Sequence, residues 1–467
     1  MIALKKIANP YRLTAITFIL YGLNPVQNIL AQSVTTIAQE QFNKFNSVEG
    51  GWCAADATIS LLLPDGKTLW LFGDTFVGEK TGTFSINPYK STMINNSAII
   101  EDGSTLTAYY GGSFENPLSL IPSEGAGYFW PEHATTENDT LKIFAVRATY
   151  KDNGTAGFNF QVGASYIASY QYPDMEHIST SKVESVTDST FRFGACIVQS
   201  GNYTYIFGVK DTTAGGFTYP LPYLARVNQS VDEPWQFYSG SDSWSYSCND
   251  AKPLGDRPMS ESFFVYEYNN KFYLIMHEIW TVGELYILEA DKITGPWNRA
   301  TSGGKEVLFA VIRPHTNSFS YNLFAHPQFQ DENKILISFN VNTSDFGSIY
   351  TDTKNYRARF YWLSIDNAIT ATTPDTLSLF NDLSDAAIIL PESSTSKLLF
   401  NQATHELSIQ GIASPSVVTV YGIDGKPYLT LNISSDTVVN LGCLPKTMLI
   451  VQLKSKAKVD IKKIINI

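Results

Sequence analysis

Residues 52–78 read WCAADATISLLLPDGKTLWLFGDTFVG and contain two β-prone runs joined by a short turn. The first run is ATISLLL, the turn is PDG, and the second run is TLWLFG. A Pro-Asp-Gly turn between two apolar runs is typical of a β-hairpin. Asp56 stands before the first run and Asp74 follows the second. Because the two strands are antiparallel, we expect both carboxylates at the same edge of the sheet.

The same hairpin recurs four more times along the chain. Close copies are RFGACIVQSGNYTYIFGVKD and SESFFVYEYNNKFYLIMHE, and looser copies are WPEHATTENDTLKIFAVR and AHPQFQDENKILISFNVN. The second strands align on anchors spaced by roughly 63 to 73 residues, namely Trp70, Ile143, Ile206, Leu274 and Ile337. Each interval has room for four antiparallel strands, so we predict an all-β protein with a five-bladed β-propeller over residues 32–390. Residues 32–49 could supply an outer strand to the last blade. The regular spacing disfavours the alternative, a β-sandwich.

Composition narrows the possible ligands. The chain has 467 residues, of which 13% are aromatic and 16% charged, and its formal net charge is −11. Nucleic acid is excluded as a partner because phosphate binding needs a basic face. Neutral polar ligands such as glycans remain open. The four cysteines are too few for a disulfide scaffold and contain no CxxC pair, so disulfides and buried thiols both stay open for Cys53, Cys196, Cys248 and Cys443.

The N-terminus has the pattern of a secretory signal. Basic residues Lys5, Lys6 and Arg12 precede the apolar run LTAITFILYGL, and Ala31 offers a small residue before a cleavage point. We predict a signal peptide over residues 1–31. A membrane anchor is the alternative, but the run is short for a transmembrane helix.

In a propeller, the first residues of the inner strands surround one mouth of the central channel. The five predicted positions hold mostly acids and imidazoles: Asp56, Glu132 with His133, Gly194, Glu261 and His326. The second strands return to the same rim and end at Asp74, Arg147, Asp211, Glu278 and Asn340. Hydrolysis of a glycosidic bond uses two carboxyl groups, so a ring of acids in an aromatic-lined funnel predicts a glycosidase.

We assign catalytic roles to three of these acids. Asp56 is the predicted base or nucleophile and Glu261 the general acid, because blades one and four place them across the channel from each other. Asp74 is the predicted neighbour that holds the acid's pKa high. Glu132 is a second candidate for that part and is also predicted to bind substrate; otherwise Glu132 and Glu278 are supporting or structural groups.

Other residues near the mouth are predicted to bind substrate. Aromatic platforms for sugar rings are expected at Trp52, Trp130, Phe193 and Tyr321. His326 could contact a sugar hydroxyl, hold a calcium ion through water, or fill the core. Arg359 could clamp an acid of the ring, and Asn96 could belong to the rim. We predict no metal among the catalytic groups and no required cofactor, although a structural calcium ion is left open.

Several motifs resemble those of a known family. The residues are DATISLLLPDGKTLWLFGDTFVG, NNSAII, FGACIVQSGNYTYIFGVKD, EPWQFYSGSDSW and YNLFAHPQF with ILISFNVN and YRARF. Over about residues 50–365 they resemble a family of secreted bacterial five-bladed propellers, long described only as a domain of unknown function, that includes endo-D-arabinanases. The resemblance implies endo-hydrolysis of furanosyl linkages in D-arabinan-type polysaccharide, with acids at Asp56 and Glu261. The alternative is a surface propeller that binds glycans without cleaving them. A sialidase is disfavoured because its arginine triad and Asp-box turns are missing; a lyase stays open.

Residues 391–467 form a separate tail of short strands, including KLLFNQATHELSIQG and SVVTVYGIDGKPYLTLN. With VYGIDGKPY and the closing KKIINI, this tail resembles the β-sandwich sorting domain of the type IX secretion system of Bacteroidetes. The resemblance implies contact with that secretion machinery, passage through the periplasm, and a secreted or cell-surface location. The alternative, a carbohydrate-binding module, is disfavoured because the tail lacks tryptophan. We expect the protein to be a monomer.

Overall fold

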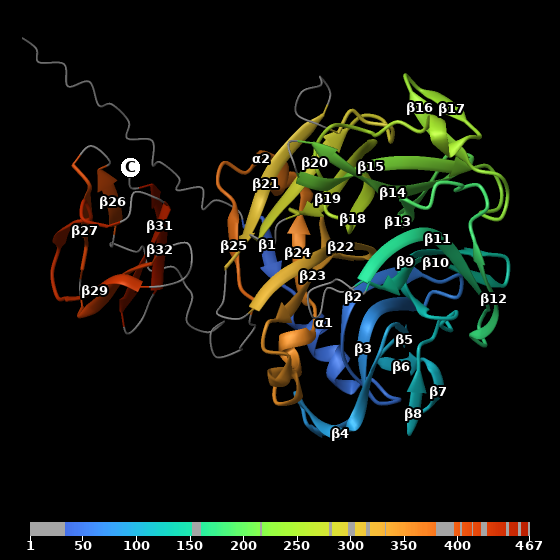
Figure 1. Cartoon of the computed structure of the whole chain (residues 1–467), viewed down its shortest axis with the longest axis horizontal. Helices are drawn as coiled ribbons and strands as arrows, with labels where there is room; N and C mark the ends of the chain where they lie inside the picture. Colours follow the sequence, from blue (N-terminus) through green and yellow to red (C-terminus); the bar gives the residue numbers. More distant parts are fainter. Residues whose placement is uncertain are drawn as a thin grey trace, which may run out of the picture. The chain divides into compact units, whose positions relative to one another are not determined.

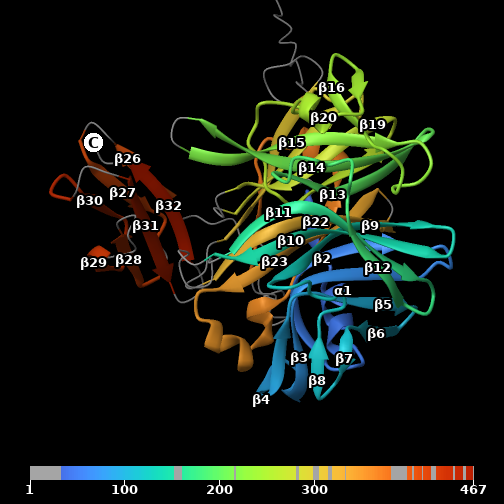
Figure 2. The same cartoon turned by 45° about the vertical axis from the view of Figure 1, so that its right-hand side comes forward.

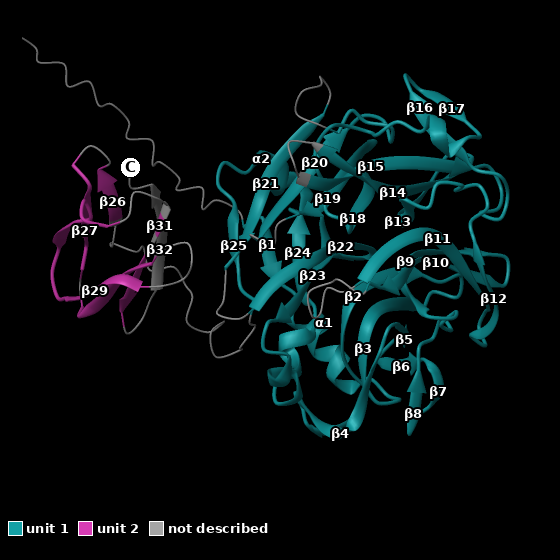
Figure 3. Ribbon diagram, in the orientation of Figure 1, with its two compact units in different colours: residues 1–380 teal, residues 381–467 magenta. Residues whose placement is uncertain are grey.

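The computed structural model describes residues 33–465 except 152–159, 215–216, 280–282, 298–303, 314–317, 332, 380–396, 402–403, 413, 422–426, 445–447 and 456–458. The predicted signal peptide lies outside these residues. The chain divides into two compact units, residues 1–380 and 381–467 (Figure 3). The predicted domain boundary after residue 390 falls in range 380–396, which is also outside the described residues.

Unit 1 is built from five successive sheets that follow one another in chain order (Figures 1 and 2). Blade 1 contains β2 (Trp52–Leu62), β3 (Thr68–Gly82), β5 (Ser97–Asp102) and β6 (Thr105–Tyr109), with β4 (Ser85–Ile94) paired to the far half of β3. Blade 2 contains β9 (Gly127–Glu137), β10 (Thr140–Tyr150), β11 (Phe160–Gln171) and β12 (Glu176–Lys182). The short hairpin of β7 (Gly111–Ser113) and β8 (Asn116–Leu118) lies between them in the sequence.

The remaining blades follow the same plan. Blade 3 contains β13 (Phe191–Ser200), β14 (Tyr203–Ala214), β15 (Phe217–Val227), β16 (Gln236–Gly240) and β17 (Ser243–Ser245). Blade 4 contains β18 (Phe263–Tyr268), β19 (Lys271–His277), β20 (Glu284–Ala290) and β21 (Lys305–Ile312), to which β25 (Asp375–Leu377) adds in parallel. Blade 5 contains β22 (Ser318–Asp331), β23 (Lys334–Thr343) and β24 (Arg359–Ser364). Each anchor of the sequence repeat lies in the second strand of its blade, which confirms the predicted five-bladed propeller.

The N-terminus completes the last blade, as the sequence allowed. Strand β1 (Thr35–Ile37) pairs antiparallel with β24, with Thr35 opposite Leu363. Asp375 then joins this strand to blade 4, because its Oδ2 accepts hydrogen bonds from the Thr35 amide at 2.7 Å and the Thr35 hydroxyl at 2.9 Å. The short helix α1 (Gln39–Lys44) follows β1, and α2 (Ile365–Thr370) follows β24. Both ends of the propeller sequence therefore meet at blades 4 and 5.

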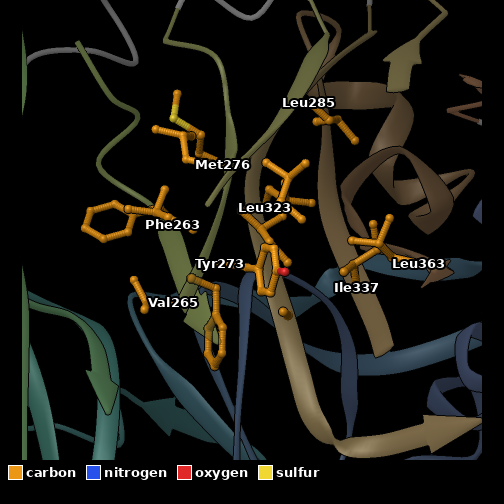
Figure 4. Close-up of a cluster of buried hydrophobic side chains, with 14 of the residues drawn as sticks. Phe263, Val265, Tyr273, Met276, Leu285, Leu323, Ile337 and Leu363 are labelled. Carbon is orange, nitrogen blue, oxygen red and sulfur yellow. The ribbon is translucent and has the colours of Figure 1, made fainter. Parts of the chain in front are cut away.

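The hydrophobic core lies between neighbouring blades. Its largest cluster combines side chains of blades 3, 4 and 5, and Figure 4 shows part of it, with Phe263 and Val265 from β18 near Leu323 from β22. Further clusters join blades 1 and 2 and blades 2 and 3. Because both faces of each sheet are covered by neighbours, large aromatic side chains fill much of the interface volume. Cys53, Cys196 and Cys248 are buried thiols.

Unit 2 is a small β-sandwich, as predicted. One sheet orders β26 (Lys397–Asn401), β27 (Glu406–Gln410) and β30 (Thr437–Asn440). The other orders β29 (Pro427–Ile433), β28 (Ser416–Tyr421), β31 (Met448–Ser455) and β32 (Val459–Ile465). The two sheets enclose a buried apolar core that includes Leu407, Ile409, Val418, Val420 and Val451. Among the residues described in both units, no helix has the length and apolar character needed to span a membrane.

Candidate active site

In the described part of the propeller, four of the five inner strands change register along their length. In β9, Glu132 and His133 lie opposite Phe144 alone, and in β13 the pairing skips Gly194 and Ala195. Strand β2 shifts register around Asp56, and β22 does so around Asn322. Such bulges turn a side chain away from its regular alternation and are common beside active sites. Asp56, Glu132 and Gly194 are therefore placed by bulges inside their strands, whereas Glu261 precedes the regular strand β18.

Asp56 is held by blade 5 across the blade boundary. Its Oδ2 accepts hydrogen bonds from the hydroxyl of Tyr321 at 2.8 Å and that of Tyr356 at 2.9 Å. Burial, followed by the charge of Asp74, raises the pKa of Asp56 to about 7, although both phenols favour the ionised form. Its Oδ1 lies against Gly73, where a Cβ would stand only 2.5 Å away. Only glycine at position 73 leaves room for the carboxylate.

Asp74, the second predicted acid of blade 1, lies beside Asp56. Its Oδ1 accepts hydrogen bonds from Asn95 Nδ2 at 3.2 Å and from the indole of Trp130 at 3.1 Å. Burial raises the pKa of Asp74, while these two donors oppose the shift. The structure therefore brings together Asp56, Asp74, Tyr321 and Trp130, four of the predicted site residues.

A second group of charges contains Glu132, Glu261, Arg192 and Asp211. The guanidinium of Arg192 is nearly buried, and its Nη2 donates to Glu261 Oε1 at 2.9 Å and to Asp211 Oδ1 at 2.8 Å. Burial raises the pKa of Glu132 to about 8, the charge of Glu261 adds to the rise, and Arg192 opposes it. The Glu261 side chain is 54% exposed and ion-paired, whereas Glu132 is half-buried.

These two groups suit acid–base chemistry in different ways. A group that donates a proton must still hold it at the working pH, and burial of Glu132 favours the protonated form. Asp56 sits among hydroxyl donors that stabilise its anion. The arrangement thus offers one carboxyl group that holds its proton and one that is supported as a carboxylate.

Five of the predicted substrate-binding side chains do not reach the site. His326 is fully buried four residues beyond the bulge of β22, with Nδ1 2.6 Å from Ser60 Oγ and Nε2 2.9 Å from Ser338 Oγ. Burial lowers its pKa to about 3, so it is a neutral core residue rather than a ligand contact. The prediction was wrong because the inner strand begins at Ser318, eight residues before His326.

The others are enclosed for related reasons. Trp52 and Phe193 are core residues, at 2% and 0% exposure, and cannot act as stacking platforms. Arg359 donates to the backbone carbonyls of Arg357 and Lys354 instead of clamping an acid of the ring. Asn96 bridges backbone groups of Phe129 and Ile121. Its neighbour Asn95 faces Asp74 instead, because adjacent side chains point in opposite directions.

Sequence reasoning missed Arg192 and Tyr356 as parts of the site. Arg192 stands two residues before Gly194, and that spacing was the available signal, since alternate strand residues share a face. Tyr356 lies in the 3-10 turn Thr353–Tyr356, whose placement depends on tertiary contacts. Within the described ranges, no three His, Cys, Asp or Glu side chains gather as metal ligands.

Comparison with solved structures agrees with the fold. A Bacteroides ovatus protein, provisionally described as a hydrolase, aligns with a TM-score of 0.58 at 18% identity over 73% of this chain and 93% of its own. The GH43_1 enzyme from Xanthomonas citri complexed with xylotriose aligns at 0.40, with 12% identity over 74% of this chain and 98% of its own. An alpha-L-arabinofuranosidase from Lactobacillus brevis aligns at 0.42, with 9% identity over 71% and 97%.

Among curated proteins, none matches this sequence. One family model does, over residues 39–365, which run from the start of α1 to the residue after β24 and so take in the site described above. That family carries the description of a domain of unknown function, in keeping with the resemblance drawn from the hairpin motifs. Since the match covers well over half of the sequence, the chain belongs to the DUF5005 family.

Proposed function

We propose that this protein is a glycoside hydrolase that cleaves furanosyl linkages by endo-action on D-arabinan-type polysaccharide. The observation that carries the proposal is the pair of half-buried carboxyl groups, Asp56 and Glu132, on adjoining inner strands at one mouth of the propeller. Their surroundings differ, with two phenol donors at Asp56 and the charges of Glu261 and Arg192 near Glu132, and these differences fit the two roles that glycoside hydrolysis requires. The fold shared with the Bacteroides ovatus protein is compatible with this reading but does not establish an activity.

The roles follow from the surroundings of each carboxyl group. Asp56 acts as base or nucleophile, oriented by the phenols of Tyr321 and Tyr356. Glu132 takes the part of general acid that the sequence had suggested for Glu261. Its raised pKa, about 8, keeps the carboxyl group protonated at neutral pH. Glu261, fixed by Arg192, then raises the pKa of Glu132 through its charge. Asp74 does the same for Asp56.

The test is hydrolysis of D-arabinan and L-arabinan by the mature protein beside Asp56→Asn, Glu132→Gln and Glu261→Gln variants. We expect D-arabinan to be cut, with kcat about 10²- to 10⁴-fold lower for Asp56→Asn and Glu132→Gln. Glu261→Gln should lose less, because it acts through Glu132. Glu267→Gln, an exposed change at the other end of the same blade, is the matched control.

Three results would change this view. If Glu261→Gln loses more rate than Glu132→Gln, Glu261 is the general acid. If neither polymer is cut although the protein binds one of them, the propeller is a glycan-binding protein or acts on another glycan. If Asp56→Asn stays folded and fully active, the site is misplaced.

The remaining proposals concern the setting of this activity. We propose that residues 1–31 are removed on export and that residues 391–467 direct the protein through the type IX secretion machinery to the cell surface or beyond. The C-terminal β-sandwich supports the second point through its architecture. We further propose that the enzyme is a monomer and requires no cofactor; a structural calcium ion stays a hypothesis.

A further inference from the structure

We propose that four aromatic side chains on blade 2 form a binding face for sugar units of a polymeric substrate beyond the cleavage position. They are Tyr128, Trp130, Tyr150 and Phe160, here called the blade 2 aromatic face. The inference rests on the proposed function, since it places a neutral polysaccharide at the same mouth. Only Trp130 was singled out by the sequence.

Strand register places all four side chains on one side of the sheet. Tyr128 and Trp130 are two residues apart on β9, and Tyr128 pairs with Ala148 of β10. Tyr150 lies two residues beyond Ala148, and it pairs with Phe160 of β11. Because alternate residues on a strand and paired residues on neighbouring strands share a face, the four rings gather at one end of blade 2.

The rings contact one another in a continuous series. Trp130 meets Phe160 edge to face at a centroid separation of 4.8 Å and Tyr128 at 5.4 Å. Tyr128 in turn contacts Tyr150 at 5.6 Å. Edge-to-face packing of this kind fixes ring orientation. The series is therefore a rigid apolar surface rather than a set of independent side chains.

One end of this surface reaches the acids and the other reaches solvent. The indole of Trp130 donates to Asp74 Oδ1, which ties the inner end to the neighbour of Asp56. Trp130 is partly exposed, Tyr128 is 8% exposed and Tyr150, at the outer end, is 68% exposed. A tyrosine that is two-thirds exposed contributes little to the core, so its packing on Tyr128 does not explain its presence.

The chemistry of the surface fits a neutral sugar chain. Aromatic faces are apolar, and the indole N–H and phenol O–H groups place polar atoms at their edges. Ligand sites of this type combine apolar rings with a few oriented polar groups. A short substrate bound at Asp56 does not reach Tyr150, so its cleavage does not depend on that side chain. A polymer that continues along blade 2 contacts Tyr150. The face thus favours long chains over terminal units.

The experiment compares Tyr150→Ala with wild type on soluble D-arabinan and on a short p-nitrophenyl arabinofuranosyl oligosaccharide, using the full mature chain. We expect kcat/KM on the polymer to fall about tenfold, mainly through KM, which corresponds to ~1.4 kcal/mol. On the short aryl glycoside the change should be less than about twofold. Tyr246→Ala removes another tyrosine of 68% exposure, from blade 3, and should behave as wild type.

An equal loss on both substrates, or no loss on either, overturns the aromatic face while the hydrolase proposal stands. Cleavage of the aryl glycoside with no action on the polymer overturns it as well. If wild type cleaves neither substrate, the hydrolase proposal fails, and retardation in a gel containing D-arabinan decides the binding question. Retarded wild type with weaker retardation of Tyr150→Ala then supports the face; equal mobility, or no retardation at all, overturns it.

Discussion

Asp56 and Glu132 show how neighbouring side chains act on the pKa of two half-buried carboxyl groups. Asp56 receives two phenol hydrogen bonds that favour its anion, yet burial still raises its pKa to about 7. Glu132 has the cation of Arg192 nearby, but burial and the charge of Glu261 raise its pKa to about 8. In both cases the loss of hydration is the largest cause, because a charge is costly to take out of water.

These pKa values predict a narrow pH optimum. The base form of Asp56 appears as pH rises through about 7, and the acid form of Glu132 is lost as pH rises through about 8. We expect a bell-shaped dependence of kcat/KM with its maximum between these values. Tyr321→Phe removes a hydrogen bond that lowers the pKa of Asp56, so its ascending limb should move to higher pH. A profile that is flat from pH 5 to 9 would contradict both assignments.

The sequence located most of the acids but not their supports. Asp56 and Asp74 lie on either side of a hairpin whose Pro-Asp-Gly turn is recognisable in the sequence, so their proximity follows from the hairpin alone. Arg192 and Tyr356 lie in unremarkable local sequence, and only the packing of separate blades brings them to the carboxylates. The proposed exchange of roles between Glu261 and Glu132 likewise rests on their difference in burial, which no local sequence pattern predicts.

At the level of the strand, the bulges decide which side chains face the mouth. In blade 3 the bulge depends on Gly194, whose φ of +125° is a conformation that other residues rarely adopt. A bulge of this kind leaves no reliable mark in a hydrophobic pattern. For this reason, the prediction placed the site residues at the ends of the strands and included His326 among them.

Gly194→Ala should be harmful for two reasons. The conformation is strained for alanine, and its Cβ would stand 2.6 Å from Phe144 Cβ and 3.1 Å from Glu132 Cβ. We expect a loss of roughly 1–3 kcal/mol in the free energy of unfolding, measured with urea, together with reduced kcat. Gly201→Ala is the control, since its φ is +61° and nothing lies within 4 Å of the added atom. Equal effects of the two changes would exclude a specific role for Gly194.

The sequence predicted the overall architecture better than it predicted the site residues or the strand irregularities. The repeated hairpin predicted the number of blades, because each unit is long enough for one sheet and too short for two. The tail was separable by its change to short strands without tryptophan. Neither pattern indicated β25, a strand of three residues that depends on its neighbours for its existence.

The junction made by Asp375 should contribute measurably to stability. Asp375→Ala leaves the amide and hydroxyl of Thr35 without their acceptor, at a cost of about 1–3 kcal/mol for a partly buried donor. The midpoint of urea unfolding should therefore fall. Asp102→Ala, which removes an exposed partner of Lys67 at 3.5 Å, is the control and should change stability by less than about 1 kcal/mol. An unchanged midpoint for Asp375→Ala would show that the strand pairing alone closes the propeller.

The Thr35–Asp375 contact also joins residues 340 positions apart, and we expect a contact of this sequence separation to form after the local ones. Single blades need only local pairings and can form earlier. Asp56, however, obtains both of its phenol partners from blade 5, on the other side of this closure. During refolding, secondary structure should therefore recover before catalytic activity does. The time course of recovered activity then reports when blades 1 and 5 come together and the propeller closes.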